Sequence, residues 1–132
     1  MFVDQLERQG THDPAAYLSV SAAIAFQNER GWPSVRKQCH ELVRLARHQI
    51  ADLTGIEPQV ADDPQWFAQM AVLPLPPAVD APALKSRLYD EYRIEIPAMQ
   101  WGGVPCLRVS VQGYNTHSDI ERLVAAVRAL LP

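Results

Sequence analysis

The sequence predicts an α+β domain in which a small, mostly antiparallel sheet carries helices packed on one face. Three observations support this fold class: a long apolar stripe of helical period over residues 33–54, a Gly102-Gly103 pair between two strand-like runs, and an amphipathic helix after a capping box at Thr116. The chain has 132 residues, of which 48% are hydrophobic. One domain of this size can bury a core without disulfides or metal.

The N-terminal part predicts one short element and one helix. Residues 2–9 mix apolar and charged side chains and suggest a short strand or a lead-in segment. Asp13 suits an N-cap and Pro14 suits the first helical position, so a helix is expected from there to about Arg30. Gly31 stands where a C-terminal glycine is expected.

A second helix is expected from Pro33 to about Thr54, ended by Gly55. Its apolar stripe consists of Val35, Cys39, Leu42, Val43, Ala46, Ile50 and Leu53. The opposite face carries the charged residues Arg36, Lys37, Glu41, Arg44 and Arg47. We interpret this charged cluster as a solvated helix face rather than an anion site.

The middle of the chain predicts a loop, a strand and a third helix. Residues 56–65 read as a loop, and the short apolar run 66–75 as a buried strand closed by prolines. Asp80 can cap a helix over residues 81–92. Residues 93–96 alternate between polar and apolar, as in a strand.

The C-terminal part predicts a hairpin and a last helix. Residues 99–101 and 104–111 form the two arms, and Pro105 suggests an edge position or a bulge near the start of the second arm. Thr116 and Asp119 have the spacing of a capping box. The stripe of the helix that follows consists of Ile120, Leu123, Val124, Val127 and Leu130.

Composition argues against several classes of partner. A formal net charge of -3 disfavours nucleic acid, and no polybasic segment suggests a membrane surface. With no signal-peptide run and no spanning apolar stretch, we expect a cytoplasmic protein. Cys39 and Cys106 share no CxxC spacing and are expected to be core residues, although a disulfide stays possible. The four histidines are His12, His40, His48 and His117, and none is spaced from a cysteine or a carboxylate as metal ligands are. We therefore expect no metal site.

Two segments go beyond the fold class. The first is Gly-Thr-His-Asp-Pro at residues 10–14, before an alanine-rich helix, and the second is Leu-Arg-Val-Ser-Val-Gln-Gly-Tyr-Asn-Thr at residues 107–116. Together they resemble the C-terminal small domain of class V aminotransferase-like enzymes, which depend on pyridoxal phosphate. Within that group they look most like the isopenicillin N epimerase branch. The resemblance covers essentially the whole chain, residues 1–132, as a single small domain.

The resemblance implies a role for Arg108. In the family, an arginine at this strand position grips the substrate α-carboxylate, and a guanidinium offers the planar fork that matches two carboxylate oxygens. Alternation in a strand places Leu107 and Val109 on one face and Arg108 with Ser110 on the other. The apolar face should meet the helices, which would leave Arg108 facing the large domain. Without the family pattern, Arg108 would read as a strand arginine in a surface ion pair.

The resemblance also implies a cofactor contact at Gly10 and Thr11. In the family, a Gly-Thr pair here lends a backbone N–H and a hydroxyl to the cofactor phosphate of the neighbouring subunit. The simpler reading is a turn before a helix cap. Two departures weaken the epimerase assignment: His12 stands where an arginine is common, and the residues at 8–9 are Arg-Gln where an aromatic is frequent.

The chain lacks the features of the large, cofactor-holding domain. Lys37 and Lys85 are its only lysines, and neither stands in the family's cofactor-lysine context. We therefore expect no catalysis and no bound pyridoxal phosphate in this chain alone. The complete enzyme would be a homodimer with a large domain or chain, acting at Cα of an amino acid by epimerisation, elimination or desulfuration. The alternative is a non-catalytic interaction domain that keeps the fold and pairs with a separate chain.

Overall fold

The computed structural model describes residues 2–7, 10–11 and 13–131. The chain forms two compact units, Met1–Trp32 and Pro33–Pro132. Each unit is described by itself. Within the described residues, no helix is both long enough and apolar enough to cross a lipid bilayer.

The N-terminal unit contains three helices: α1 (Phe2–Glu7), α2 (Ala15–Leu18) and α3 (Val20–Glu29). The short strand considered for residues 2–9 is wrong, because α1 occupies most of that segment; its apolar residues recur at helical rather than alternating spacing. The helix expected from Pro14 is present but interrupted at Ser19, whose hydroxyl donates to the Ala16 carbonyl at 2.8 Å. The N-cap of α2 is Pro14, one residue later than expected, although the side chain of Asp13 still accepts a hydrogen bond from the Ala15 N–H at 2.9 Å.

Helices α2 and α3 bury none of their residues. The large apolar side chains that they expose are Tyr17, Leu18, Val20, Ile24 and Phe26. Apolar surface of this extent on a helix is normally covered by another body.

The C-terminal unit begins along α4 (Trp32–Thr54), the longest helix of the chain. Its predicted apolar stripe is confirmed, since Cys39, Val43, Ala46 and Ile50 are buried in the core. The interpretation of its charged face as fully solvated is wrong for Arg47, which is only 3% exposed. The loop after α4 folds back over this side, so a face that is polar in sequence becomes partly buried.

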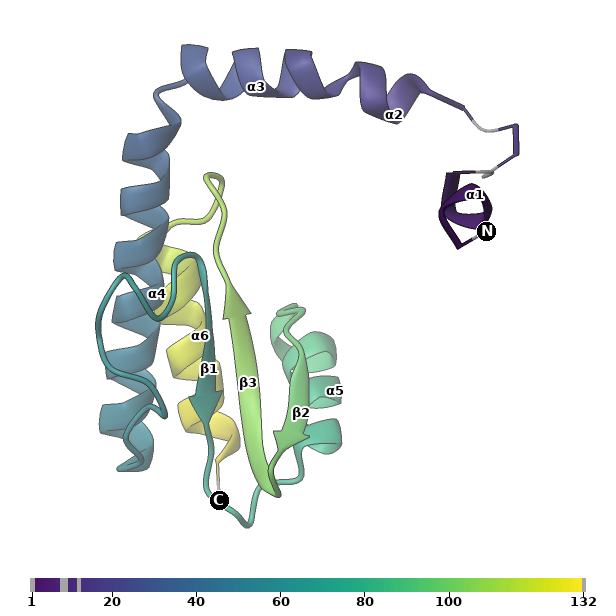
Figure 1. Cartoon of the computed structure of the whole chain (residues 1–132). Helices are drawn as coiled ribbons and strands as arrows, with labels where there is room; N and C mark the ends of the chain where they lie inside the picture. Colours follow the sequence, from purple (N-terminus) through teal and green to yellow (C-terminus); the bar gives the residue numbers. More distant parts are fainter. Residues whose placement is uncertain (1, 8–9, 12, 132) are drawn as a thin grey trace. The chain divides into compact units, whose positions relative to one another are not determined.

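The sheet has three antiparallel strands in the order β1-β3-β2: β1 (Met70–Pro74), β3 (Val104–Ser110) and β2 (Ala98–Trp101). Figure 1 shows β3 in the middle, with β2 beside its first half. The predicted hairpin is confirmed, because Gly102 and Gly103 join β2 to β3 with φ of 57° and 81°. Positive φ at both positions is what a two-residue turn requires.

Pro105 lies in the central strand, so the expected edge position is wrong. Its missing N–H is tolerated because the ladder with β1 ends beside it: the last pair is Pro74↔Cys106, and Leu75 lies just beyond β1. The Pro105 carbonyl still accepts the Leu75 N–H at 2.9 Å. The strand expected over residues 66–75 is shorter than expected, since β1 begins only at Met70.

Helix α5 (Ala81–Tyr92) has the expected bounds, and its Asp80 cap accepts the Ala83 N–H at 3.0 Å. The strand expected over residues 93–96 is absent from the structure, which assigns these residues no strand. Arg93 instead adopts a left-handed φ of 57°, and the Ile94 N–H donates to the Leu88 carbonyl at 3.0 Å. This helix-ending hydrogen bond overrides the alternating pattern of the sequence.

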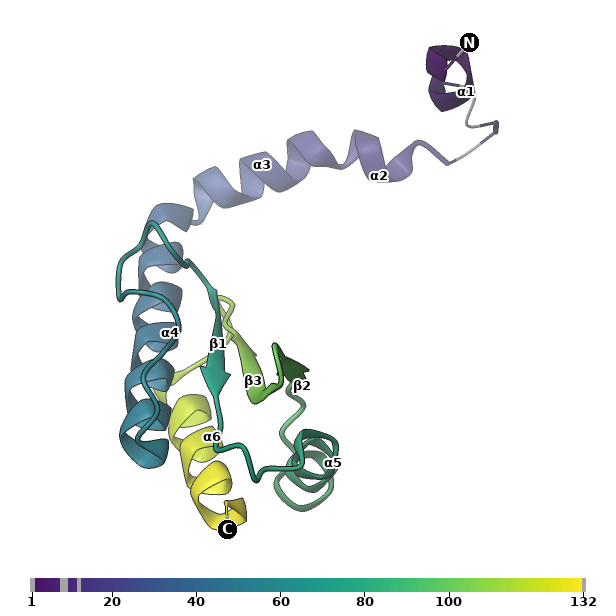
Figure 2. The ribbon, with the colours of Figure 1, turned by 60° about the horizontal axis from the view of Figure 1, so that its bottom comes forward.

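Helix α6 (His117–Leu130) starts at the predicted capping box, in which both the Thr116 and the Asp119 side chains take part. Figure 2 shows α4, α5 and α6 on one side of the sheet. Inward-facing strand residues such as Leu73, Leu107 and Val109 join the core with these helices. The predicted α+β fold with helices on one face is therefore confirmed, and Cys39 is buried and free, as is Cys106.

Candidate functional site

Arg108 lies on the open face of the sheet, the face turned away from the helices. Its neighbours in β3, Leu107 and Val109, are 0% and 5% exposed, whereas Arg108 and Ser110 are exposed. Among the described residues, no hydrogen bond or ion pair involves the Arg108 guanidinium. The alternation predicted for this strand is thus observed, and the side chain is left with its donors facing outward.

Next to Arg108, the pairing of β2 with β3 stops at a proline. The ladder between β2 and β3 ends at the pair Ala98↔Leu107. One step further, the Arg108 N–H donates to the Pro97 carbonyl at 2.9 Å. Pro97 has no N–H to return to the Arg108 carbonyl, so the second hydrogen bond of that pair cannot form. Across the described chain, no backbone hydrogen bond continues the pairing to Ser110 on this side.

A small slot occupies the place where the sheet has opened. We call it the Arg108 slot; its volume is about 160 Å³. It is lined by Ile94, Glu95, Ile96, Pro97, Arg108, Val109, Ser110, Val111, Asn115, Asp119, Ile120 and Leu123. Its walls are mainly aliphatic, and its charged groups are one guanidinium and two carboxylates.

The end of β3 is held by a compact turn. The Asn115 N–H donates to the Gln112 carbonyl at 2.8 Å, and the Asn115 side chain accepts the Gln112 N–H at 2.9 Å. The Gln69 side chain donates to the Gln112 side chain at 3.2 Å. Gly113 packs so closely that an added Cβ would lie 2.9 Å from Val35 Cγ1. These contacts fix the strand that carries Arg108 against α4.

Asp119 is committed to capping α6. Its carboxylate accepts the Thr116 backbone N–H at 2.8 Å and the Thr116 hydroxyl at 3.1 Å. These hydrogen bonds, the backbone one first, lower the pKa of the Asp119 carboxyl below its ordinary value. Asp119 therefore stays ionised and engaged at the base of the Arg108 slot.

Gly10 and Thr11 lie in the N-terminal unit, and both are exposed. Gly10 has a φ of 70°, which suits glycine, and a Cβ added there would meet no atom within 4 Å. The departures noted at residues 8–9 and at His12 lie outside the described residues.

Sequence reasoning missed a charged network that ties the loop after α4 to the helix. The Asp62 carboxylate accepts Arg44 Nε at 2.9 Å and Nη2 at 2.8 Å, and His48 Nε2 lies 2.9 Å away. The Arg44 hydrogen bond, more than any other contact, holds the pKa of Asp62 far below its ordinary value. The only signal in the sequence was that acidic residues of this loop follow a helix with a basic face. The network is structural and lies apart from Arg108.

Beside this network, a buried stack anchors the same loop. The Arg47 guanidinium lies 4.1 Å from the centre of the Phe67 ring and donates to the Val60 carbonyl. The His40 ring stacks on Phe67 with centroids 4.7 Å apart. Burial lowers the pKa of Arg47, although it stays charged at neutral pH. These contacts explain why Arg47 is buried without making it part of a ligand site.

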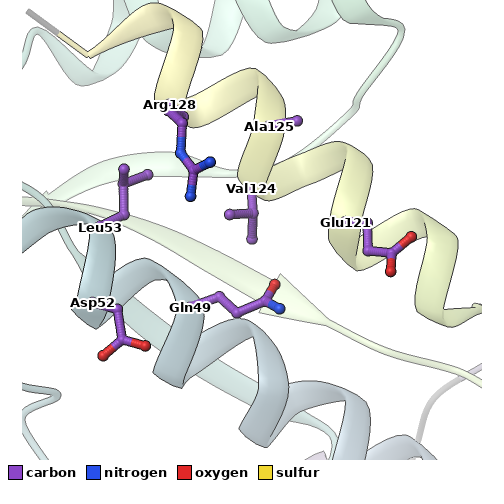
Figure 3. A pocket seen from close by; sticks show the side chains of 7 residues that line it. All are labelled: Gln49, Asp52, Leu53, Glu121, Val124, Ala125 and Arg128. Atoms are coloured by element: carbon purple, nitrogen blue, oxygen red, sulfur yellow. The ribbon is translucent and has the colours of Figure 1, made fainter.

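A larger pocket of about 410 Å³ lies between α4 and α6. Figure 3 shows Arg128 of α6 and Gln49 of α4 reaching into it, with Val124 between them. None of the residues predicted to bind substrate or cofactor lines this pocket. In the part of the chain that the structure describes, no group of histidine, cysteine and carboxylate side chains could hold a metal ion.

Comparison with known proteins tests the resemblance that the sequence predicts. The chain is 36% identical over 125 residues to isopenicillin N epimerase from Amycolatopsis lactamdurans, and 35% identical over 126 residues to isopenicillin N epimerase from Streptomyces clavuligerus. The predicted resemblance to isopenicillin N epimerases is confirmed. The matches cover 95% and 96% of this chain but only 31% and 32% of those proteins. The chain thus spans about a third of the length of the epimerases that it matches.

A solved structure gives the same answer for the fold. Alanine–glyoxylate aminotransferase from Nostoc sp. superposes with a TM-score of 0.60 at 23% sequence identity, over 72% of this chain and 26% of the aminotransferase. The chain therefore shares its α+β fold with part of that aminotransferase. No family model matches the chain.

Proposed function

We propose that this chain is the C-terminal small domain of a cytoplasmic, pyridoxal-phosphate-dependent enzyme of the isopenicillin N epimerase type, acting at Cα of an amino-acid substrate. The identity to two epimerases over nearly the whole chain supports the proposal, as does the aminotransferase fold. The observation that carries it is Arg108, which is exposed on the open sheet face without an ionic partner among the described residues. When bound, pyridoxal phosphate supplies an electron sink for the negative charge that develops at Cα.

In this proposal Arg108 is the carboxylate clamp. Two parallel N–H groups of its guanidinium bind the two oxygens of the substrate α-carboxylate and so orient the Cα–H bond. The strand is held at this point, because β1 pairs with β3 from Cys106 to Ser110 and Val72 lies opposite Arg108. Since no interaction within the described chain has to be broken first, the guanidinium is ready for a ligand.

Gly10 and Thr11 contribute to the cofactor phosphate site of the neighbouring subunit. Gly10 has a left-handed backbone and no side chain, so a phosphate that approaches this turn meets no Cβ. The Thr11 hydroxyl adds a donor. This role requires a homodimer, since the phosphate belongs to the other subunit.

The remaining cofactor contacts have to come from a large domain. Lys37 and Lys85 lie at exposed positions on α4 and α5, and neither lines the Arg108 slot. Titration of the isolated chain with pyridoxal phosphate should therefore give no stoichiometric, borohydride-reducible adduct at a single lysine. Formation of such an adduct would contradict the assignment of the cofactor site to a separate domain.

The test of the clamp is Arg108→Lys in a complete enzyme that contains this chain. Lysine keeps the charge but loses the two-pronged geometry. We expect kcat/KM to fall by about 1.5–3 kcal/mol in transition-state stabilisation, the scale of a charged hydrogen bond. Arg128→Lys is the matched control, because Arg128 is exposed and lines the separate α4–α6 pocket. Equal kcat/KM for both variants would refute the clamp.

One observation also supports a second function, a non-catalytic interaction domain. Helices α2 and α3 bury no residue, and their apolar side chains suit pairing with another chain whether or not catalysis follows. Mixing this chain with a large-domain chain separates the two functions. Cofactor binding by the mixture supports the enzyme, and a stable complex without cofactor supports the interaction domain.

A further inference from the structure

The Arg108 slot exists because Pro97 cannot complete its pair with Arg108. Upstream of Pro97, the chain no longer follows β3, and the backbone of Ser110 is left without a partner on that side within the described residues. Arg108 lines this slot, so a substrate carboxylate held by Arg108 would lie beside it. The slot is thus placed to receive whatever group extends from the same substrate.

The lining of the slot is selective. Ile94, Ile96 and Val109 give it aliphatic walls, which exclude water from the interior. Glu95 lines the slot together with Ser110. Glu95 is exposed, whereas its neighbour Ile96 is 6% exposed and belongs to the core.

Binding of a substrate α-carboxylate would change the balance of charge in the slot. Arg108 and Glu95 line the same slot, yet no ion pair joins them within the described chain. A bound α-carboxylate would neutralise Arg108. Lys85 lines a neighbouring pocket together with Glu95, but no ion pair joins them within the described residues. Asp119 is committed to the cap of α6, so Glu95 would be the slot's carboxylate without a charged partner.

We propose that the Arg108 slot receives the substrate side chain and that Glu95 determines specificity there, favouring neutral or hydrogen-bond-donating side chains over those that carry a carboxylate. This inference rests on the proposed carboxylate clamp. A second carboxylate placed beside Glu95 meets like-charge repulsion, whereas an amide of the same shape can donate to Glu95. The residue acts on the choice of substrate and takes no part in bond breaking.

The experiment compares glutamate with glutamine, which differ only in the side-chain carboxylate, as competitive inhibitors of a complete enzyme that contains this chain. In the parent enzyme, glutamine should bind more tightly than glutamate. Glu95→Gln removes the charge and keeps the shape, so the preference for glutamine should fall about three- to tenfold, the scale of a partly exposed charge pair. Glu121→Gln is the control: Glu121 is an exposed carboxylate that lines the α4–α6 pocket, and its variant should leave the preference unchanged.

Arg108→Lys tests the carboxylate clamp separately from the specificity role of Glu95. If Arg108→Lys weakens both inhibitors and Glu95→Gln leaves their ratio unchanged, the specificity proposal is overturned and the clamp stands. If Arg108→Lys changes neither inhibition constant, the clamp fails and the specificity proposal fails with it. Inhibition by neither amino acid at saturating concentration would also overturn the proposal.

Discussion

The network around Asp62 allows a stability prediction to be worked out from distances. Asp62→Asn should lower the free energy of unfolding by about 1–2 kcal/mol at pH 7. Arg44 contributes three contacts to the carboxylate, from Nε at 2.9 and 3.0 Å and from Nη2 at 2.8 Å, and His48 adds one at 2.9 Å. Charged hydrogen bonds of this kind are worth about 1.5–3 kcal/mol when buried. The Asp62 and Arg44 side chains are 27% and 39% exposed, so solvent screening reduces that figure.

The same network sets the pH dependence. The pKa of Asp62 is lowered in the folded state, first by the Arg44 hydrogen bond. A carboxyl group with a lowered folded-state pKa stabilises the fold fully above its unfolded pKa of about 4 and loses that contribution as the pH falls from there toward the folded-state pKa. The parent chain should therefore lose its advantage over Asp62→Asn progressively below about pH 4.

Urea unfolding of the two chains, followed by far-UV circular dichroism at pH 7 and pH 3, provides the measurement. Glu41→Gln is a suitable control, since Glu41 contacts the same Arg44 at 3.0 Å but is 52% exposed, and it should cost no more than about 0.5 kcal/mol. The reasoning is refuted if Asp62→Asn costs no more than the control at pH 7. A difference from the parent that is equally large at both pH values would refute it as well.

Four further outcomes are expected. Thr116→Ala should lower the free energy of unfolding by about 1 kcal/mol, measured by thermal melting, because the capping box is lost; an unchanged Tm would contradict this. Gly113→Ala should cost about 1–3 kcal/mol in the same assay, since the new Cβ would lie 2.9 Å from Val35 Cγ1, and an unchanged Tm would contradict this close packing. Light scattering at about 100 µM should show a dimer or larger species, because α2 and α3 expose apolar side chains, and a clean monomer would count against it. Cys106, 1% exposed and with a thiol pKa raised by burial, should react with a thiol reagent only after unfolding, and rapid labelling of the native chain would contradict that burial.

Most helices could be predicted because their signals are local. The stripe of α4 and the caps at Asp80 and Thr116 depend on residues within a few positions of one another, and all three are observed. The failures are tertiary. Arg47 is buried only because a loop closes over it, and Pro105 is tolerated in the central strand only because β1 ends beside it.

The candidate site shows the same division. The outward direction of Arg108 could be predicted from alternation with Leu107, and in the structure Arg108 is exposed while Leu107 is buried. The slot beside it could not be predicted, because it depends on a register that sets Pro97 opposite Arg108, and on a left-handed Arg93 that ends α5 where alternation suggested a strand. Register is a property of paired strands and is not encoded in the spacing of one of them.

The order of strands in the sheet has a consequence for the folding pathway. β3 meets β2 through a two-residue turn, which can close within about 1–10 µs, whereas β1 is separated from β3 by the whole of α5. Since closing the longer loop costs more chain entropy, the hairpin should form early and β1 should join a strand that is already in place. The strand that bears Arg108 would then be the nucleus on which the sheet assembles. Destabilising changes at Gly102 or Gly103 should slow refolding, whereas changes in β1 should mainly speed unfolding.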